Sequence, residues 1–253
     1  MNNWNLISAN LIGREHELSK RNNQDFCKTY QNDNIIIGVI CDGCSEGAHS
    51  EFGAKFVGNI LLKYLKISSH IEWENTTMTP EAYYNSFIIS ELENVISKFN
   101  TFNTTEEKVK IIKDYFLCTT VFFMISKHTG KILIGNSGDG VVIIENQILR
   151  NDQNDKPHYL AYQCIPNEYL SMNRNEMTSL YITIHNFNYF DRFAIGSDGL
   201  LALPNLQEIF GKKGRQLQRM FNVYQAKQKL FGDDTSCIIL EKEEIKSENN
   251  LSK

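Results

Sequence analysis

Residues 35–56 read IIIGVICDGCSEGAHSEFGAKF, which indicates a strand, a loop and a helix in succession. A continuous apolar run ends at Asp42 and Gly43, and after a short polar loop apolar residues recur at helical spacing from Ser50. The run is typical of a buried strand, so a carboxylate at its end needs a reason, because burying a charge is unfavourable. Comparable acids at strand ends recur in ILIGNSGDG (residues 132–140), FAIGSDGL (residues 193–200) and GDDTSCIIL (residues 232–240).

The remaining pattern predicts helices outside stacked antiparallel sheets. Amphipathic helices are expected from residue 50 and over residues 84–99, with core packing as the expected role of their apolar faces and partner docking as the rival. Residues 150–178 show no clear period and are expected to form an insertion or a flap. Short segments rich in β-branched and aromatic residues predict strands at residues 26–30, 35–41, 117–126, 131–136, 141–145, 179–185, 192–196 and 235–241.

Composition narrows the class of protein. With 253 residues, 42% of them hydrophobic and 22% charged, the chain is an ordinary globular sequence that can bury a large core. A net charge of −4 argues against nucleic acid or an anionic membrane as the main partner, since both require clustered Lys and Arg. No stretch resembles a signal peptide or approaches the roughly 18 apolar residues of a membrane helix.

The cysteines and the carboxyl end add two expectations. The six cysteines lie mostly in apolar, strand-like runs, which predicts reduced thiols and a cytoplasmic location. Cys41 and Cys44 have zinc-ligand spacing, but no second such pair completes a four-ligand site. Residues 243–253 are charged and rich in Asn and Ser, so we expect them to be a disordered tail after a domain of residues 1–242.

Asp42, Asp139, Asp198 and Asp233 each lie at a predicted strand boundary, so four distant segments can bring carboxylates to one rim. The negative charges of such a cluster would repel one another, and the carboxylates would take up protons unless bound cations offset the charge. Hard oxygen ligands favour Mg²⁺ or Mn²⁺ over zinc. Glycines after three of these acids allow sharp turns and leave a backbone carbonyl free to approach a metal. For any single Asp-Gly pair, an ordinary turn is the alternative interpretation.

These motifs carry a resemblance to a family. In the order CDGCSEGAHSEFGA, GNSGDG, GSDGL and GDDTSCIIL, they resemble the successive motifs of the PPM-type metal-dependent serine/threonine phosphatases, also called the protein phosphatase 2C family. Upstream, GREHELSKRNNQDF resembles the first motif of the family, in the form with Gln-Asp that a bacterial branch has. Each motif alone is weak, but together they span residues 13 to about 240 in the family order.

The resemblance implies a fold, an activity and partners. The implied fold is α+β, a four-layer αββα sandwich of two antiparallel β-sheets flanked by helix pairs, in agreement with the pattern above. The implied activity is hydrolysis of phosphoserine and phosphothreonine in proteins phosphorylated by a Ser/Thr kinase, by a signalling enzyme expected to be a cytoplasmic monomer. A pseudophosphatase that binds phosphoprotein without turnover, and a small-molecule phosphomonoesterase, stay open as alternatives.

The resemblance also implies roles for the acids. Asp42 would bridge two Mn²⁺ or Mg²⁺ ions, with the Gly43 carbonyl as a further ligand, and Asp198 and Asp233 would complete the shell of one ion. Asp25 would hold metal-bound water, and Asp139, together with Asp198, would match the site of a third, weaker ion. In that mechanism a hydroxide between the two ions attacks phosphorus in line, and no phosphoenzyme forms.

The chain departs from the family pattern near Asp25. The phosphate-binding Arg of the family lies five positions before that acid, where this chain has Lys20 followed by Arg21. Lys pairs with phosphate as a point charge but lacks the bidentate fork of Arg, so both residues are candidates. The residue before Asp25 is Gln24 instead of an acid, which removes one charge beside the expected metal site.

The group that protonates the leaving alcohol is also open. Eukaryotic members often have a His after the Asp-Gly pair, and this chain has Cys44 there. Cys44 is expected to be a bystander, because a catalytic thiol needs a basic partner. His16 and His49 are the nearby candidates for the acid, with a surface or capping role as the alternative for each.

Overall fold

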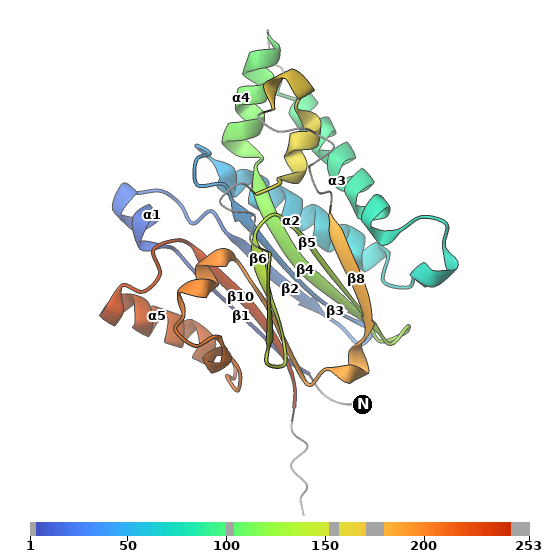
Figure 1. Ribbon diagram of the computed structural model, residues 1–253, viewed down its shortest axis with the longest axis vertical. Helices are drawn as coiled ribbons and strands as arrows, with labels where there is room; N and C mark the ends of the chain where they lie inside the picture. Colours follow the sequence, from blue (N-terminus) through green and yellow to red (C-terminus); the bar gives the residue numbers. More distant parts are fainter. Residues whose placement is uncertain (1–3, 100–103, 152–156, 171–179, 244–253) are drawn as a thin grey trace, which may run out of the picture.

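The computed structural model describes residues 4–99, 104–151, 157–170 and 180–243. Within this part of the chain, two five-stranded antiparallel sheets stack face to face (Figure 1). The first sheet has the order β1-β10-β9-β6-β7, with β1 at Trp4–Leu11, β10 at Thr235–Lys242, β9 at Arg192–Gly196, β6 at Gly140–Ile144 and β7 at Gln147–Asn151. The second has the order β2-β3-β4-β5-β8, with β2 at Phe26–Gln31, β3 at Ile35–Gly43, β4 at Cys118–Ser126, β5 at Lys131–Ser137 and β8 at Tyr181–Asn186.

The apolar run that opens the sequence forms β3, which is buried on both faces. Successive side chains of a strand point to opposite faces, so Ile37 and Val39 pack beneath helices while Ile36 and Ile40 pack against the other sheet. In the layer between the sheets, Ile36 and Ile40 meet apolar side chains from both sheets, including Phe193 of β9. This double burial explains why the segment shows no polar alternation.

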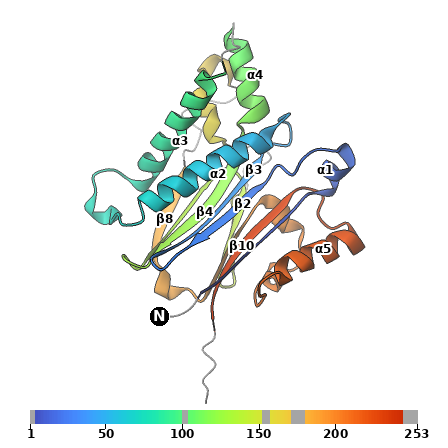
Figure 2. The same ribbon diagram turned by 180° about the vertical axis from the view of Figure 1, so that it is seen from behind.

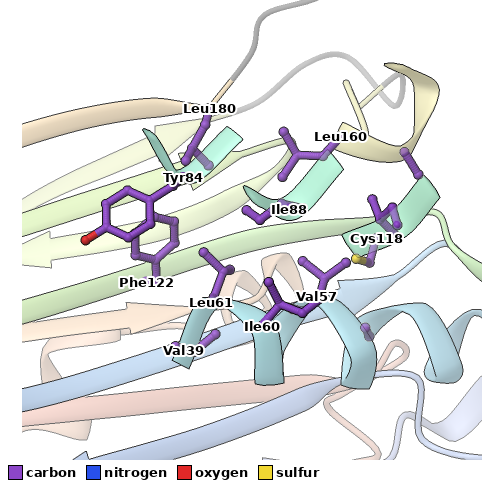
Figure 3. Close-up of a cluster of buried hydrophobic side chains, with 14 of the residues drawn as sticks. Val39, Val57, Ile60, Leu61, Tyr84, Ile88, Cys118, Phe122, Leu160 and Leu180 are labelled. Atoms are coloured by element: carbon purple, nitrogen blue, oxygen red, sulfur yellow. The ribbon is translucent and has the colours of Figure 1, made fainter. Parts of the chain in front are cut away.

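Two long helices cover the outer face of the second sheet. They are α2 (Ser50–Ile67) and α3 (Pro80–Ser97), and α2 lies across β2, β3 and β4 (Figure 2). Figure 3 shows Val57 and Leu61 of α2 meeting Tyr84 and Ile88 of α3 above Val39 of the sheet. Nearby lie α4 (Thr105–Tyr115) and the 3₁₀ helices η1 (Trp73–Asn75), η2 (Leu160–Cys164) and η3 (Asn167–Tyr169).

The outer face of the first sheet is covered by α5 (Gln216–Gln228) (Figure 2). Leu217 and Phe221 of this helix pack with Ile7 and Ala9 of β1. The 3₁₀ helices η6 (Asp198–Ala202) and η7 (Leu206–Ile209) join the same core. The short helix α1 (Arg14–Ser19) lies at one end of the sandwich, and η5 (Phe187–Tyr189) connects β8 to β9.

The predicted fold is confirmed: two antiparallel sheets form a sandwich with helices on its outer faces. Each predicted strand is present, with ends that move by one or two residues, and both predicted helices are present. The predicted strand start at residue 179, most of residues 150–156, residues 171–178 and the tail after residue 243 lie outside the described residues. Elements that the sequence did not predict are β1, β7, α1, α4 and α5.

None of the helices in the described residues combines the length and the apolar character that a membrane span requires.

Candidate functional site

Strand register brings the predicted acids to one rim of the sandwich. Asp42, at the end of β3, pairs with Thr119 near the start of β4, and Thr120 pairs with Ser137 at the end of β5. The chain then crosses to the other sheet through a bend of only two residues, because β6 begins at Gly140. The rims of the two sheets therefore meet at this bend.

The first sheet brings its own acids to the same rim. Val141 at the start of β6 pairs with Gly196 at the end of β9, and Gly196 also pairs with Cys237 near the start of β10. Asp198 lies two residues after the end of β9, and Asp233 lies two residues before β10, so both acids share the edge at which β3 ends. Antiparallel pairing thus gathers acids that the sequence separates by up to about 190 positions.

Asp25 lies buried where the two sheets meet. Its Oδ2 accepts a hydrogen bond of 2.9 Å from the Ser197 hydroxyl, whose oxygen accepts in turn from the backbone N–H of Ser236. The other oxygen, Oδ1, is buried without a hydrogen-bond partner. Burial raises the pKa of Asp25 to about 7; the nearby side chains of Ser236 and Ser197 oppose that rise, and the charge of Asp234 adds to it.

The carboxylates raise one another's pKa. Burial holds the pKa of Asp42 well above its usual range, and the charges of Asp25, Asp198 and Asp233 raise it further. Burial also raises the pKa of Asp233; the N–H of Asp234 lowers it, and the charge of Asp198 raises it again. The structure therefore brings four of the predicted acids within electrostatic range of one another, in a cluster that favours proton uptake when no cation is bound.

The donor set fits a hard divalent cation. Asp198 Oδ1, like Asp25 Oδ1, is buried and has no hydrogen-bond partner, so both oxygens are available as ligands or as acceptors from bound water. The cluster offers carboxylate oxygens, which Mg²⁺ and Mn²⁺ prefer. Gly43 is tightly enclosed, since an added Cβ would lie 2.8 Å from Ser50 Oγ and 3.0 Å from the carbonyl of Gln24. A side chain at this position beside Asp42 would therefore force Ser50 or the backbone of Gln24 to shift.

Asp139 lies half-buried in the bend between β5 and β6, on the same rim. The preceding Gly138 has a φ of +77°, the left-handed conformation that favours glycine, which gives the Gly-Asp-Gly motif a structural reason. Asn151 at the end of β7 donates to the carbonyl of Gly138 and holds the bend. The role of Asp139 at a third metal site stays a prediction.

Asp234 differs from its neighbour in its contacts. It is fully buried and accepts from the N–H groups of Gly13 and Gln24, and His16 Nδ1 lies 2.9 Å from its Oδ2. His16, Asp233 and Asp234 each offer a ligand atom within 4.8 Å of the others. His16, a predicted acid for the leaving group, is thus buried against Asp234. The sequence did not distinguish the roles of the two adjacent acids.

The predicted phosphate-binding residues lie on exposed backbone next to the rim. Lys20 ends α1 with a φ of 57° in the left-handed region. Arg21 Nη1 donates to the carbonyl of Ser45 at 2.5 Å, which places its guanidinium beside the loop that follows Asp42. His49, the other candidate acid, precedes α2 and is exposed; its Nδ1 lies 3.8 Å from Glu51 Oε1.

The segment at residues 157–170 places one aromatic side chain, Tyr159, near the rim, which the sequence did not predict. The Ser137 hydroxyl donates to the carbonyl of His158 at 3.0 Å, and this bond ties the segment to the end of β5. Burial raises the pKa of Tyr159, and Cys44 and Asp42 raise it further, so this tyrosine lies near both. No periodicity marks it, because it lies in a 3₁₀-rich segment.

Comparison of the sequence with models of known protein families gives a match over most of the chain. A family model described as Protein phosphatase 2C matches residues 12–232, most of the chain, and ends just before Asp233. A search of curated protein sequences found no match.

Solved structures with the same fold include three bacterial proteins. RsbX in complex with magnesium has a TM-score of 0.54 and 13% identity, over 95% of this chain and 96% of that one. The serine/threonine phosphatase Stp1 from Staphylococcus aureus has a TM-score of 0.56 and 18% identity, over 96% of each chain. PppA, described as a key regulatory component of T6SS in Pseudomonas aeruginosa, has a TM-score of 0.57 and 12% identity, over 95% of this chain and 98% of that one. At these identities the likeness establishes the fold.

Proposed function

The chain belongs to the protein phosphatase 2C family, and from this premise we propose that it is a metal-dependent phosphatase that hydrolyses phosphoserine and phosphothreonine in proteins. One observation carries the proposal: Asp25, Asp42, Asp198 and Asp233 meet at one rim, where burial and mutual repulsion raise the pKa of three of them. A protein would gain nothing from this unfavourable cluster unless a cation offsets it.

The acids at the rim have separate proposed roles in metal binding and in the activation of water. Asp42, the Gly43 carbonyl, Asp198 and Asp233 would hold two Mn²⁺ or Mg²⁺ ions, and Asp139 with Asp198 would hold a third. Such ions, when bound, acidify a water molecule and offset the charge on the phosphoryl oxygens. Asp25, fixed by the Ser197 hydroxyl, would accept a proton from attacking water or orient it through its unpartnered Oδ1.

Lys20 and Arg21 are the proposed phosphate-binding groups. Arg21 offers a planar fork that suits two phosphoryl oxygens, and its bond to Ser45 already directs it toward the loop after Asp42. Lys20 offers a single ammonium on a flexible stem. We assign both to substrate binding, with Arg21 as the bidentate contact, since its guanidinium already binds the carbonyl of Ser45 beside the rim.

The proposed substrate is a phosphoprotein, the product of a Ser/Thr kinase, in the cytoplasm. Support comes from the family and from structural neighbours that include a serine/threonine phosphatase and a bacterial serine phosphatase. The thiols of Cys27, Cys41, Cys44, Cys118 and Cys237 are free, which suits a reducing compartment. Asp233, at the edge of the rim, is exposed and can be reached from solvent.

A turnover comparison tests this proposal. Metal-stripped protein is supplied with Mn²⁺ and assayed on a phosphoserine peptide, a phosphothreonine peptide and a small sugar phosphate. We expect hydrolysis of both peptides, with kcat/KM well above that for the sugar phosphate. Faster turnover of the sugar phosphate would instead identify a small-molecule phosphomonoesterase. Peptide binding without release of phosphate would identify a pseudophosphatase.

A further inference from the structure

The segment from residue 13 to residue 24 leaves the first sheet, forms α1 and returns to the rim. Its amino end contacts the loop before β10: the N–H of Arg14 donates to the carbonyl of Phe231 at 3.1 Å, and that of Glu15 to the carbonyl of Gly232 at 3.0 Å. Gly13 packs so closely on the backbone of Asp233 that a Cβ there would overlap it. The segment therefore depends on the β10 loop for its position.

Asp234 holds both ends of this segment. Its Oδ1 accepts from the N–H of Gly13 at 2.6 Å, and its Oδ2 accepts from the N–H of Gln24 at 2.5 Å. The second oxygen also lies 2.9 Å from His16 Nδ1, within hydrogen-bond distance. With Asp234 1% exposed and His16 6% exposed, these contacts are shielded from water.

The contacts of Asp234 set it apart from a metal ligand. Both of its oxygens are engaged by N–H donors, whereas Asp25 and Asp198 each keep a buried oxygen without a partner. A carboxylate that accepts two or three N–H bonds is well satisfied and has little to gain from a cation. Asp234 is buried, and the reaction proposed above gives it no role.

Lys20 and Arg21 lie between the two ends that Asp234 joins. Downstream of α1, the N–H of Arg21 donates to the carbonyl of His16 at 2.9 Å. The histidine thus contacts the carboxylate through its ring and the phosphate-binding residue through its backbone. Loss of the ring contact would remove one of the bonds that hold the segment between Gly13 and Gln24, without touching Asp42 or Asp198.

We propose that Asp234 and His16 form a clasp that closes the segment at residues 13–24 and positions Lys20 and Arg21 for the phosphoryl group. The proposal rests on the function proposed above and deepens it. His16 is a positioning residue in this account, and it neither binds metal nor transfers a proton to the leaving group. Its removal should weaken phosphate binding and leave the chemistry of the bound substrate largely intact.

Matched substitutions at His16 test the clasp. His16→Asn keeps a donor near the position of Nδ1, whereas His16→Leu fills similar space without one. His128→Ala, in the exposed turn between β4 and β5, is the control. The first readout is amide hydrogen exchange of residues 13–24 in metal-free protein. His16→Leu should expose the amides of Gly13 and Gln24 to faster exchange, while His16→Asn should behave like the wild type.

The second readout uses Mn²⁺-loaded protein. His16→Leu should raise KM for a phosphopeptide and the inhibition constant of inorganic phosphate, each by about tenfold, as for a lost hydrogen bond to a charged group, with kcat within about threefold. Mn²⁺ affinity by calorimetry should not change, and His16→Asn should recover most of the loss.

Two results would overturn the clasp while the proposed function stands. One is an active wild type in which His16→Leu changes neither exchange nor KM. The other is equal loss of kcat and Mn²⁺ affinity in both His16 variants, which would make His16 part of the metal site. A wild type that neither hydrolyses phosphopeptide nor binds phosphate with Mn²⁺ would refute the proposed function, and the clasp's role in phosphate binding with it.

Discussion

Asp25 should make the metal-free protein less stable as pH rises. Burial raises the pKa of Asp25 from 3.8 to about 7, so the folded protein holds a proton that the unfolded chain releases between these values. Because the unfolded state binds fewer protons across this window, the free energy of unfolding falls from about pH 4 to about pH 7 and then levels off. A shift of about 3 pKa units corresponds to a loss of about 4 kcal/mol.

Asp25→Asn replaces the titratable carboxyl group with an uncharged amide of nearly the same shape. The asparagine carbonyl can still accept from the Ser197 hydroxyl, so the variant keeps the hydrogen bond of 2.9 Å and loses the charge. At pH 4 the two proteins should be equally stable to within about 1 kcal/mol. At pH 8 in EDTA the variant should be more stable than the wild type by up to about 4 kcal/mol. Added Mn²⁺ should stabilise the wild type and shrink this difference.

Urea titrations in EDTA at a series of pH values measure the effect. Asp42 and Asp233 also have raised pKa values and contribute to the slope in both proteins. The difference between the two curves therefore reports the proton of Asp25 together with the effect of its charge on the pKa of Asp42. Asp33→Asn, in the exposed turn before β3, is the matched control and should follow the wild type. Parallel stability curves for the wild type and Asp25→Asn would refute a buried, repelled carboxylate at this position.

Four further substitutions test the ligand assignment, the nucleophile and the core. Asp42→Ala should abolish tight Mn²⁺ binding in calorimetry, whereas Asp139→Ala should keep two tightly bound ions and lower only the rate; equal metal binding by both variants would contradict the ligand roles. Cys44→Ser should keep activity within about tenfold, and a trapped phosphocysteine would indicate a thiol nucleophile instead. Gly38→Ala would drive a methyl group into the Phe123 ring between the sheets and should lower the free energy of unfolding by about 1–3 kcal/mol in urea; an unchanged midpoint would contradict this packing.

The elements that sequence predicts well are those whose burial leaves a simple pattern. Strand β3 was predictable because both of its faces are buried, which gives an unbroken apolar run, and α2 because one face packs on the sheet. Strand β7 was missed because it is an edge strand whose residues are mostly exposed, so nothing enforces alternation. Helix α4 has a capping box of Thr104 and Glu107, a local signal that would have found it.

The residues of the site also differ in how well the sequence predicts them. Acids that end strands, such as Asp42 and Asp198, could be picked from the sequence because an apolar run before each one marks its position. The separate tasks of Asp233 and Asp234 could not, since adjacent identical residues carry no local difference. The difference between them lies in their tertiary contacts, because the N–H groups of Gly13 and Gln24, about 210–220 positions away in the sequence, donate to Asp234.

Metal-dependent hydrolysis is the central claim, and one measurement tests it most directly. The initial rate of hydrolysis of an aryl phosphate is followed for protein stripped with EDTA, with absence of metal verified, and then during stepwise addition of Mn²⁺. We expect no turnover above background in the stripped protein and recovery of full activity as Mn²⁺ binds. Full activity in the stripped protein would contradict the account.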